Sequence, residues 1–255
     1  MNINFRYHIM VQLSVISLVL PLSLAQAEEN KTSWGLGAGV GLIDKGYAGF
    51  DSETKVLPIF YFDNKWIHVA GTDLDIKVGQ LGNVAFSAHA KFGVGDVYEE
   101  SDSYIFEGME NRQSSIWLGS KVEWKNSVVD TSLEILTDAT DKSDGQQASL
   151  DLSRTFQITD HLSFEPSINI NWYSEKYVDY YYGVQAVEAI DGRDEFHGEA
   201  SVNYGASARF RYAFDKHQSV SLGFKYESFG QEIKDSPLVD KNYSSTVSAF
   251  YLYRF

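Results

Sequence analysis

The segment Tyr243-Ser-Ser-Thr-Val-Ser-Ala-Phe-Tyr-Leu-Tyr-Arg-Phe255 is the part of this chain that best indicates its fold class. One face of it carries Val247, Ala249, Tyr251, Tyr253 and Phe255. The other face carries Thr246, Ser248, Phe250, Leu252 and Arg254. An alternation with a period of two is typical of a β-strand whose two faces meet different surroundings. A strand of this length that ends on an aromatic residue is typical of a transmembrane β-barrel.

Residues 1–27 have the composition of a secretory signal peptide. They contain a weakly basic start with Arg6 and His8, an apolar run from Ile9 to Leu24, and a small-x-small cleavage site at Ala25 and Ala27. We expect the signal to be removed and residues 28–255 to form one outer-membrane barrel domain. An uncleaved anchor helix is the alternative, but the apolar run is short for a span of about 20 residues.

The composition argues against two classes of function. The chain has no cysteine, so export brings neither a disulfide framework nor thiol chemistry. The formal net charge of −14 becomes −15 without the signal, because Arg6 is lost and no acidic residue goes with it. A chain this acidic is a poor partner for nucleic acid. The 16 tyrosines, 16 phenylalanines and 20 glycines suit a barrel with aromatic girdles.

Alternation recurs along the chain and is longest over residues 198–214. The apolar face holds Ala200, Val202, Tyr204, Ala206, Ala208, Phe210, Tyr212 and Phe214. The polar face holds Ser201, Asn203, Gly205, Ser207, Arg209 and Arg211. Strands of soluble proteins usually have about 5–6 residues, so this one is long. Charged side chains on the polar face suit a hydrated lumen better than a packed core.

Short and long connections alternate, as periplasmic turns and extracellular loops do in bacterial barrels. This rhythm requires a tight outer turn at 71–73 and an inner turn at 81–83. The sequence then predicts an all-β, antiparallel barrel of twelve strands, near 34–42, 54–62, 65–71, 73–80, 83–94, 112–124, 127–137, 146–157, 161–174, 198–214, 218–230 and 243–255. The third and fourth strands are short for a tilted span of about 9–11 residues, so ten strands is the alternative.

A soluble, exported β protein of the lipocalin type is the structural rival. It would share the signal and the alternation. It would not need long strands, two classes of loop or a terminal Phe255, and these features favour the membrane barrel.

Several short strings occur in a recognisable order. They are Trp34-Gly35-Leu36-Gly37-Ala38-Gly39-Val40-Gly41, Val56-Leu57-Pro58-Ile59-Phe60-Tyr61, Tyr180-Tyr181-Tyr182-Gly183-Val184, Asp235-Ser236-Pro237-Leu238-Val239 and the Tyr253-Arg254-Phe255 ending. This order of landmarks resembles the MipA/OmpV family of Gram-negative outer-membrane proteins. The resemblance implies a barrel in the cell outer membrane. For the branch named after the MltA-interacting protein, it implies a scaffold that joins a lytic transglycosylase to a peptidoglycan synthase. The strings do not separate this branch from the other, whose members have no settled activity.

Three groups of residues are candidates for function. Phe255, Tyr253 and Tyr251 resemble the signal that the barrel-assembly machinery reads. Arg209, Arg211, Lys225 and Glu227 share the polar face of neighbouring strands, and there the basic residues either bind anions or pair with Glu227 and Glu165. Tyr180, Tyr181 and Tyr182 are predicted to belong to an interfacial girdle or loop, with a ligand-stacking surface as the alternative.

No pattern for catalysis, a cofactor or a metal is recognisable. The histidines are scattered, and neither HExxH nor GxSxG occurs. We therefore expect a non-enzymatic scaffold that organises the envelope, in contact with outer-membrane lipid and lipopolysaccharide. The alternative function is a narrow channel for small solutes or anions, lined by Arg209 and Arg211.

Overall fold

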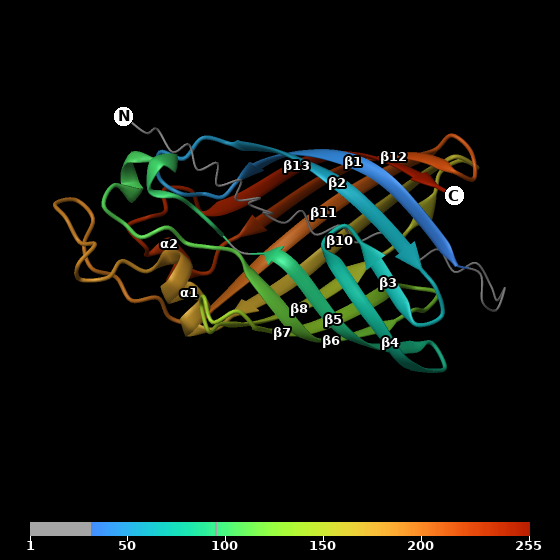
Figure 1. The fold of residues 1–255 in the computed structure, drawn as a ribbon, viewed down its shortest axis with the longest axis horizontal. Helices are drawn as coiled ribbons and strands as arrows, with labels where there is room; N and C mark the ends of the chain where they lie inside the picture. The colour runs from blue at the N-terminus through green and yellow to red at the C-terminus, as the bar shows by residue number, and fades with distance from the viewer. Residues whose placement is uncertain (1–31, 95) are drawn as a thin grey trace, which may run out of the picture.

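The alternating segments fold into antiparallel strands that close into a ring (Figure 1). The computed structural model describes residues 32–94 and 96–255. The strands are β1 (Ser33–Asp44), β2 (Glu53–Asp63), β3 (Ile67–Ala70), β4 (Asp73–Leu81), β5 (Val84–Val94), β6 (Ser115–Trp124), β7 (Asp130–Asp138), β8 (Gln146–Ser153), β9 (Phe156–Gln157), β10 (Leu162–Tyr173), β11 (Ser201–Ala213), β12 (Gln218–Ser228) and β13 (Tyr243–Arg254). The predicted signal peptide and its cleavage site at Ala25 and Ala27 lie outside the described residues.

The ring closes where the first strand meets the last one. β1 pairs with β2 on one side and with β13 on the other, and the β10–β11 ladder completes the circle. β8 and β9 pair with the same edge of β10 in one register, so they are one strand interrupted at Arg154 and Thr155. The described residues thus form a closed barrel of twelve strands. The prediction of twelve is confirmed, and the ten-strand alternative is wrong.

The two turns that the count required are present. Gly71 and Gly82 have φ of 63° and 59°, a left-handed conformation that glycine adopts without steric cost. They let β3 and β4 form a short hairpin between β2 and β5. β3 has only 4 residues.

The two ends of the barrel differ. Short turns lie at one end, called here the short-turn end, and long connections lie at the other, called the loop end (Figure 1). The long connections contain structure that the alternation did not predict: η1 (Glu100–Asp102), η2 (Tyr104–Phe106), α1 (Glu175–Tyr182) and α2 (Gln231–Lys234). No helix in the described part of the chain is both long and apolar enough to cross a membrane.

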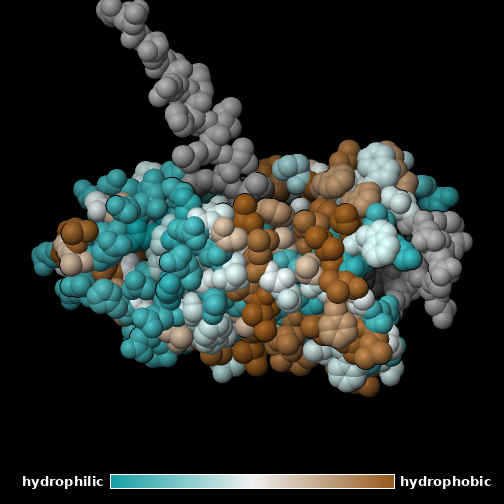
Figure 2. All heavy atoms as spheres, turned by 60° about the horizontal axis from the view of Figure 1, so that its bottom comes forward, coloured by the Kyte–Doolittle hydropathy of each residue, from teal (hydrophilic) through white to brown (hydrophobic). Residues whose placement is uncertain are grey.

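The outer face of the strands carries an apolar belt. Members of this belt include Leu36, Val40, Leu42, Val56, Phe60, Phe92, Ile116, Leu118, Ile135, Ile168, Ile170, Leu222, Phe224 and Val247. On the face shown in Figure 2, a broad brown zone covers the strands, while the loop end on the left is mostly hydrophilic. So much exposed apolar area requires a lipid environment.

Candidate functional site

Ion pairs line the inner faces of the strands, some between adjacent strands, some across an intervening strand and one within a strand. They are Lys91 with Glu134, Lys121 with Asp75 at 3.4 Å, Arg209 with Glu165 at 3.1 Å and Lys225 with Glu227 at 3.2 Å. Each cation therefore has a carboxylate within ion-pair distance. The first three of these pairs are largely buried, and breaking a buried pair leaves a costly unpaired charge, so each partner holds the other in place.

His89 on β5 lies at the centre of a buried cluster of charged side chains. Its side chain is fully buried, and its Nδ1 lies 2.7 Å from Oδ1 of Asp75. Because an ionised carboxylate only accepts hydrogen bonds, Nδ1 carries the proton. Nε2 lies 3.6 Å from Asp73 and 3.8 Å from Glu134, too far for a hydrogen bond to either. The sequence did not indicate this cluster, because His89 comes opposite Asp75 only through a register shift between Lys77 and Gly79 that strand alternation does not reveal.

A second polar cluster is centred on Glu227 of β12. Its Oε1 accepts hydrogen bonds from Asn203 at 2.8 Å and from the Tyr173 hydroxyl at 3.2 Å. Its Oε2 accepts one from Asn171 at 2.9 Å and pairs with Lys225. With this many donors the buried carboxylate stays ionised without a dedicated ligand.

A cavity of about 210 Å³ lies between these clusters inside the barrel. Its charged lining consists of Lys91, Lys121, Lys125, Arg209 and Lys225 together with Glu123, Asp130, Glu134, Asp151 and Glu165. Serine, threonine and asparagine side chains supply most of the remaining lining. Positive and negative groups are equal in number, so the lining does not favour anions. No group of three or more His, Asp or Glu side chains in the described part of the chain is placed to hold a metal ion.

The loop end of the barrel is covered by a packed layer of loops, called here the loop cap. Its buried core consists of Tyr47, Phe50, Val97, Tyr98, Phe106, Met109, Trp117, Leu136, Tyr177, Val178, Tyr181, Tyr182, Val184, Phe229, Ile233 and Leu238. These residues come from four connections and from the strand ends below them. Rings pack face to face and edge to face, as between Tyr98 and Phe106 at 3.9 Å. The loops therefore form a small hydrophobic core of their own.

Helix α1 supplies a large share of the cap core. The Ser174 hydroxyl accepts a hydrogen bond from the Tyr177 backbone N–H and starts the helix. Tyr177, Val178, Tyr181 and Tyr182 recur at helical spacing and are all buried. The apolar face of the helix is thus turned down onto the barrel.

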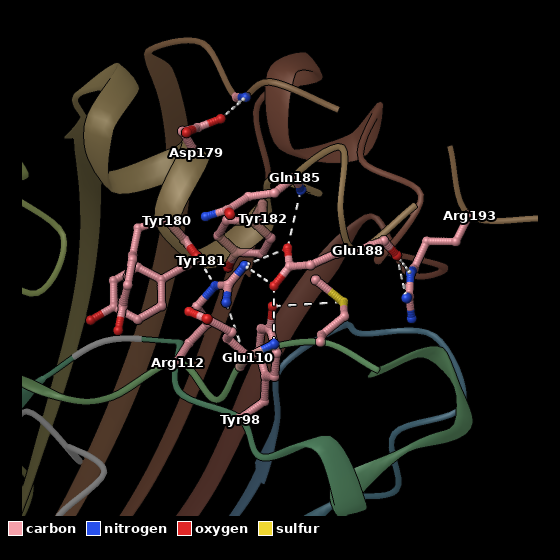
Figure 3. A network of polar contacts seen from close by, with 12 residues as sticks. Tyr98, Glu110, Arg112, Asp179, Tyr180, Tyr181, Tyr182, Gln185, Glu188 and Arg193 are labelled. Atoms are coloured by element: carbon pink, nitrogen blue, oxygen red, sulfur yellow. Dashed lines mark hydrogen bonds and ion pairs between the residues drawn. The ribbon is translucent and has the colours of Figure 1, made fainter. Parts of the chain in front are cut away.

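An ion pair between Arg112 and Glu188 holds the cap together (Figure 3). Nη2 of Arg112 lies 3.0 Å and 2.8 Å from the two carboxylate oxygens of Glu188. Arg112 also donates to the carbonyls of Tyr180 at 2.6 Å and Glu110 at 2.7 Å. Burial acts to raise the pKa of Glu188, but hydrogen bonds from Arg112 and from backbone N–H groups outweigh it and lower the pKa. The pair ties two long connections across 76 residues of sequence.

Arg193 and Asp96 fix two further contacts within the cap. The buried Arg193 guanidinium donates to the carbonyls of Ile105, Glu107 and Glu188, which joins η2 to the loop that follows α1. The Asp96 carboxylate accepts a hydrogen bond from the Tyr177 hydroxyl at 3.0 Å. Burial raises the pKa of Asp96 although hydroxyl donors oppose the rise.

The predicted lumen charges lie inside the barrel, as the polar-face pattern required. Arg209 and Lys225 are paired with Glu165 and Glu227, and Arg211 lies on the same inner face of β11. The sequence left two interpretations open, anion binding or pairing with carboxylates. These ion pairs agree with the second interpretation.

Tyr180, Tyr181 and Tyr182 lie on α1 in the loop cap and not at a strand end. Tyr181 and Tyr182 are fully buried on the helix, so the structure does not place these two residues in an interfacial girdle. They lie in the connection between β10 and β11, and a loop position was the other prediction for these tyrosines. The helix is hard to recognise in the sequence, because it has only 8 residues and lies between long alternating strands.

The terminal aromatics lie on the outer face at the short-turn end. The Phe255 ring stacks on Trp34 with ring centroids 4.0 Å apart, and its N–H donates to the Trp34 carbonyl at 2.9 Å. Tyr253 packs edge-on against Phe255, and the Tyr251 hydroxyl donates to Gln218. This cluster clamps the last strand to the first.

Comparison with known proteins places the chain among outer-membrane barrels. The family model described as MltA-interacting protein MipA matches residues 36–255. The chain is 25% identical to the MltA-interacting protein of Escherichia coli K12 over 254 residues, which are 96% of this chain and all of that protein. It is 23% identical to the outer membrane protein OmpV of Vibrio cholerae over 179 residues, covering 69% of this chain and 68% of that protein.

Solved structures of similar shape are also outer-membrane proteins. The COG4313 outer membrane channel of Pseudomonas putida F1 covers 93% of this chain and all of its own, with a TM-score of 0.49 and 12% identity. The NanC porin covers 86% of this chain and 98% of its own, with a TM-score of 0.43 and 8% identity. The match of the family model over most of the sequence decides the assignment: this β-barrel of the cell outer membrane belongs to the MipA family.

Proposed function

We propose that the barrel is a non-enzymatic scaffold, closed at its loop end, that holds murein enzymes at its short-turn end. Long loops face the outside of bacterial barrels and short turns face the periplasm, so the short turns are the surface that periplasmic proteins can reach. The related Escherichia coli protein is named for its interaction with MltA. The partners proposed here are a lytic transglycosylase and a peptidoglycan synthase.

The observation that carries this proposal is the construction of the short turns. In four of them a side-chain oxygen accepts hydrogen bonds from two backbone N–H groups: Asn64 from Trp66 and Ile67, Asn126 from Val128 and Val129, Thr159 from His161 and Leu162, and Asp215 from His217 and Gln218. Such turns are stiff. The turns also expose apolar side chains, with Trp66 at 61%, Val128 at 77% and Ile158 at 57%. Rigid turns with exposed apolar tips suit a protein-binding surface.

The test is capture of murein enzymes by the purified barrel in mild detergent. We expect the wild type to retain a lytic transglycosylase and a peptidoglycan synthase. A variant with Trp66→Ser, Val128→Ser and Ile158→Ser should lose both. A matched control carries Tyr104→Ser, Val187→Ser and Ile190→Ser at the loop end, where the side chains are similarly exposed. Failure of the wild type to retain either enzyme, or equal retention by the two variants, overturns the proposal.

A narrow channel is the second candidate, and the cavity inside the barrel is the observation in its favour. Against it, the loop cap packs a hydrophobic core over one end of the lumen. Single-channel recording of the refolded barrel in a planar bilayer separates the two functions. We expect no conductance steps from the wild type. Reproducible steps that shift with Arg209→Ala and Arg211→Ala would establish the channel instead.

A further inference from the structure

Two arginines inside the barrel lack the carboxylate partners that the lumen cations described above have. Arg211 on β11 is two residues from Arg209, and Arg254 at the end of β13 is four residues from Phe250. Since Arg209 and Phe250 line the cavity, the period of two places both arginines on the inner face. Neither guanidinium has a carboxylate within ion-pair distance in the part of the chain that the structure describes, whereas Arg209 pairs with Glu165 at 3.1 Å. The two arginines therefore bring unneutralised positive charge to the lumen.

The strand register explains why these charges are unpaired. Arg211 is in register with Ser163 on β10 and with Ser221 on β12. Arg254 is in register with Gly35 on β1. In these ladders no acidic residue lies directly opposite either arginine. Because residues opposite one another on a sheet are the ones whose side chains pair, the fold offers neither arginine a counter-ion at its own position.

The Tyr61 hydroxyl lies with the two guanidinium groups. Arg254 and Tyr61 are both in register with Gly35, which has no side chain to separate them. A Cβ added at Gly35 would lie 3.2 Å from Cγ of Arg254, so the arginine passes close over the glycine. Arg211, Arg254 and Tyr61 each interact electrostatically with the other two. These three side chains from β11, β13 and β2, called here the arginine cluster, thus converge on one region of the lumen.

The chain does not satisfy the arginine cluster by itself. Nε of Arg254 is enclosed and has no hydrogen-bond partner among the described residues. A buried donor without a partner is costly, and two like charges brought together repel one another. An oxyanion offsets both charges and offers oxygens to the free N–H groups. Arginine is suited to this role because its planar fork of donors matches the oxygens of a carboxylate or a phosphate.

The arginine cluster can be reached from the short-turn end. Arg211 and Arg254 are both partly exposed, and Arg254 lies beside the C-terminus at that end (Figure 1). The cavity extends to the same end, where Lys125 and Asp130 line it on either side of a short turn. Ser221, which is in register with Arg211, also belongs to the cavity lining. Since the loop cap covers the other end, a ligand enters from the periplasmic side.

We infer that Arg211, Arg254 and the Tyr61 hydroxyl bind a dianionic oxyanion, either a phosphate group or a pair of carboxylates, carried by a small molecule dissolved in the periplasm. The two guanidinium groups donate to the ligand oxygens, and the Tyr61 hydroxyl donates a further hydrogen bond. The site needs no pore, because the ligand enters and leaves at the short-turn end. It is also independent of the scaffold function, because the exposed apolar tips of the short turns are not part of it.

Isothermal titration calorimetry of the refolded barrel in detergent tests this site. Inorganic phosphate and succinate are titrated separately at neutral pH, with chloride holding the ionic strength constant. The test variant carries Arg211→Gln and Arg254→Gln. The matched control carries Lys65→Gln and Lys216→Gln, which remove two exposed charges from turns at the same end. Heat modifiability confirms that each variant is folded.

We expect at least one of the two anions to bind the wild type and the control with equal affinity. The double arginine variant should bind it at least about tenfold more weakly, because hydrogen bonds to charged groups are strong. Arg211→Gln alone, which leaves the last strand unchanged, and Tyr61→Phe, which keeps the ring, should each weaken binding by a smaller factor. Tighter binding of phosphate assigns the site to a phosphorylated molecule, and tighter binding of succinate assigns it to a dicarboxylate.

Three results would overturn the site. The first is that neither anion binds the wild type. The second is that the double arginine variant binds as tightly as the wild type. The third is that the control loses as much affinity as the arginine variant, which would assign the binding to the general charge of that end. None of these results bears on enzyme capture, since the apolar turn tips are unchanged in every variant.

Discussion

Glu188 is the residue on which the polar contacts of the loop cap converge. It pairs with Arg112 through both carboxylate oxygens and accepts backbone N–H bonds from Glu110 and Gln185. Replacement by glutamine leaves the Arg112 charge buried without a counter-ion. We expect Glu188→Gln to destabilise the cap by about 3 kcal/mol, the usual cost of removing one member of a buried pair. Hydrogen exchange of the loop amides measures the loss.

The control for this change is Lys176→Gln. Lys176 pairs with Asp144 at 3.5 Å in the same cap, but both side chains are well exposed. An exposed pair contributes about 0–1 kcal/mol, so loop exchange should stay close to wild type. Equal protection of the loops in Glu188→Gln and wild type would show that the cap does not depend on the Arg112 pair.

Phe255 acts at a single contact between the two ends of the chain. Deleting it removes the stack on Trp34 and the hydrogen bond to the Trp34 carbonyl. We expect the deletion to lower insertion and to leave protease-sensitive protein in the periplasm, whereas Phe255→Tyr keeps the ring and should insert. The fraction of heat-modifiable barrel is the measurement. A deletion variant that forms this barrel in normal yield would contradict the assembly role.

The first strand is shaped by its inward-facing glycines. A Cβ added at Gly39 would lie 2.1 Å from the Phe250 ring, which crosses β1 at this point. We expect Gly39→Ala to destabilise the barrel by about 1–3 kcal/mol through overpacking. Phe250→Ala in the same chain should recover part of that loss. Gly79→Ala is the control, because a Cβ there meets nothing within 4 Å. The midpoint of urea unfolding in detergent reports each change, and additive losses for the Gly39 and Phe250 substitutions would refute this packing account.

Individual elements differ in how far the sequence specified them. The long strands were predicted within a few residues, since alternation persists from one end of β11 or β13 to the other. The short β3–β4 hairpin was predicted from turn residues, with Gly71 and Gly82 marking both ends. Helix α1 was missed because tyrosines and valine also favour strands, and only packing in the cap decides between the two. The Arg112–Glu188 contact joins residues 76 apart, and no local pattern encodes it.

For the whole molecule, we expect acid to unfold the loop cap before it unfolds the barrel. The pKa of Glu188 is lowered in the folded cap, so the Glu188 carboxylate stabilises the cap above pH ~4.3, the usual pKa of a glutamate. This stabilisation is lost as the pH falls through the lowered pKa. Asp96 has a raised pKa, so its protonation favours the folded cap as the pH falls from neutral. The net loss is therefore confined to strongly acidic solution.

Loop-amide exchange, corrected for its intrinsic pH dependence, measures this acid transition. We expect a loss of loop protection at low pH while the barrel remains heat-modifiable. The Glu188→Gln variant should lack the transition, because it has no carboxylate to protonate. The same acid step in both proteins would assign the loss to another group.

Ring closure has a consequence for biogenesis. β1 and β13 pair from Gly35↔Arg254 to Asp44↔Ser245. The strand that is synthesised first and the strand that is synthesised last thus form one ladder. Until residues 243–255 have been added, β1 and β12 each have one edge whose backbone N–H and C=O groups lack hydrogen-bond partners. Such an edge is costly in hydrocarbon. A prematurely terminated polypeptide can thus form every hairpin and still fail to seal. Barrel closure therefore requires the last strand. Incomplete translation products stay accessible to proteases on the periplasmic side.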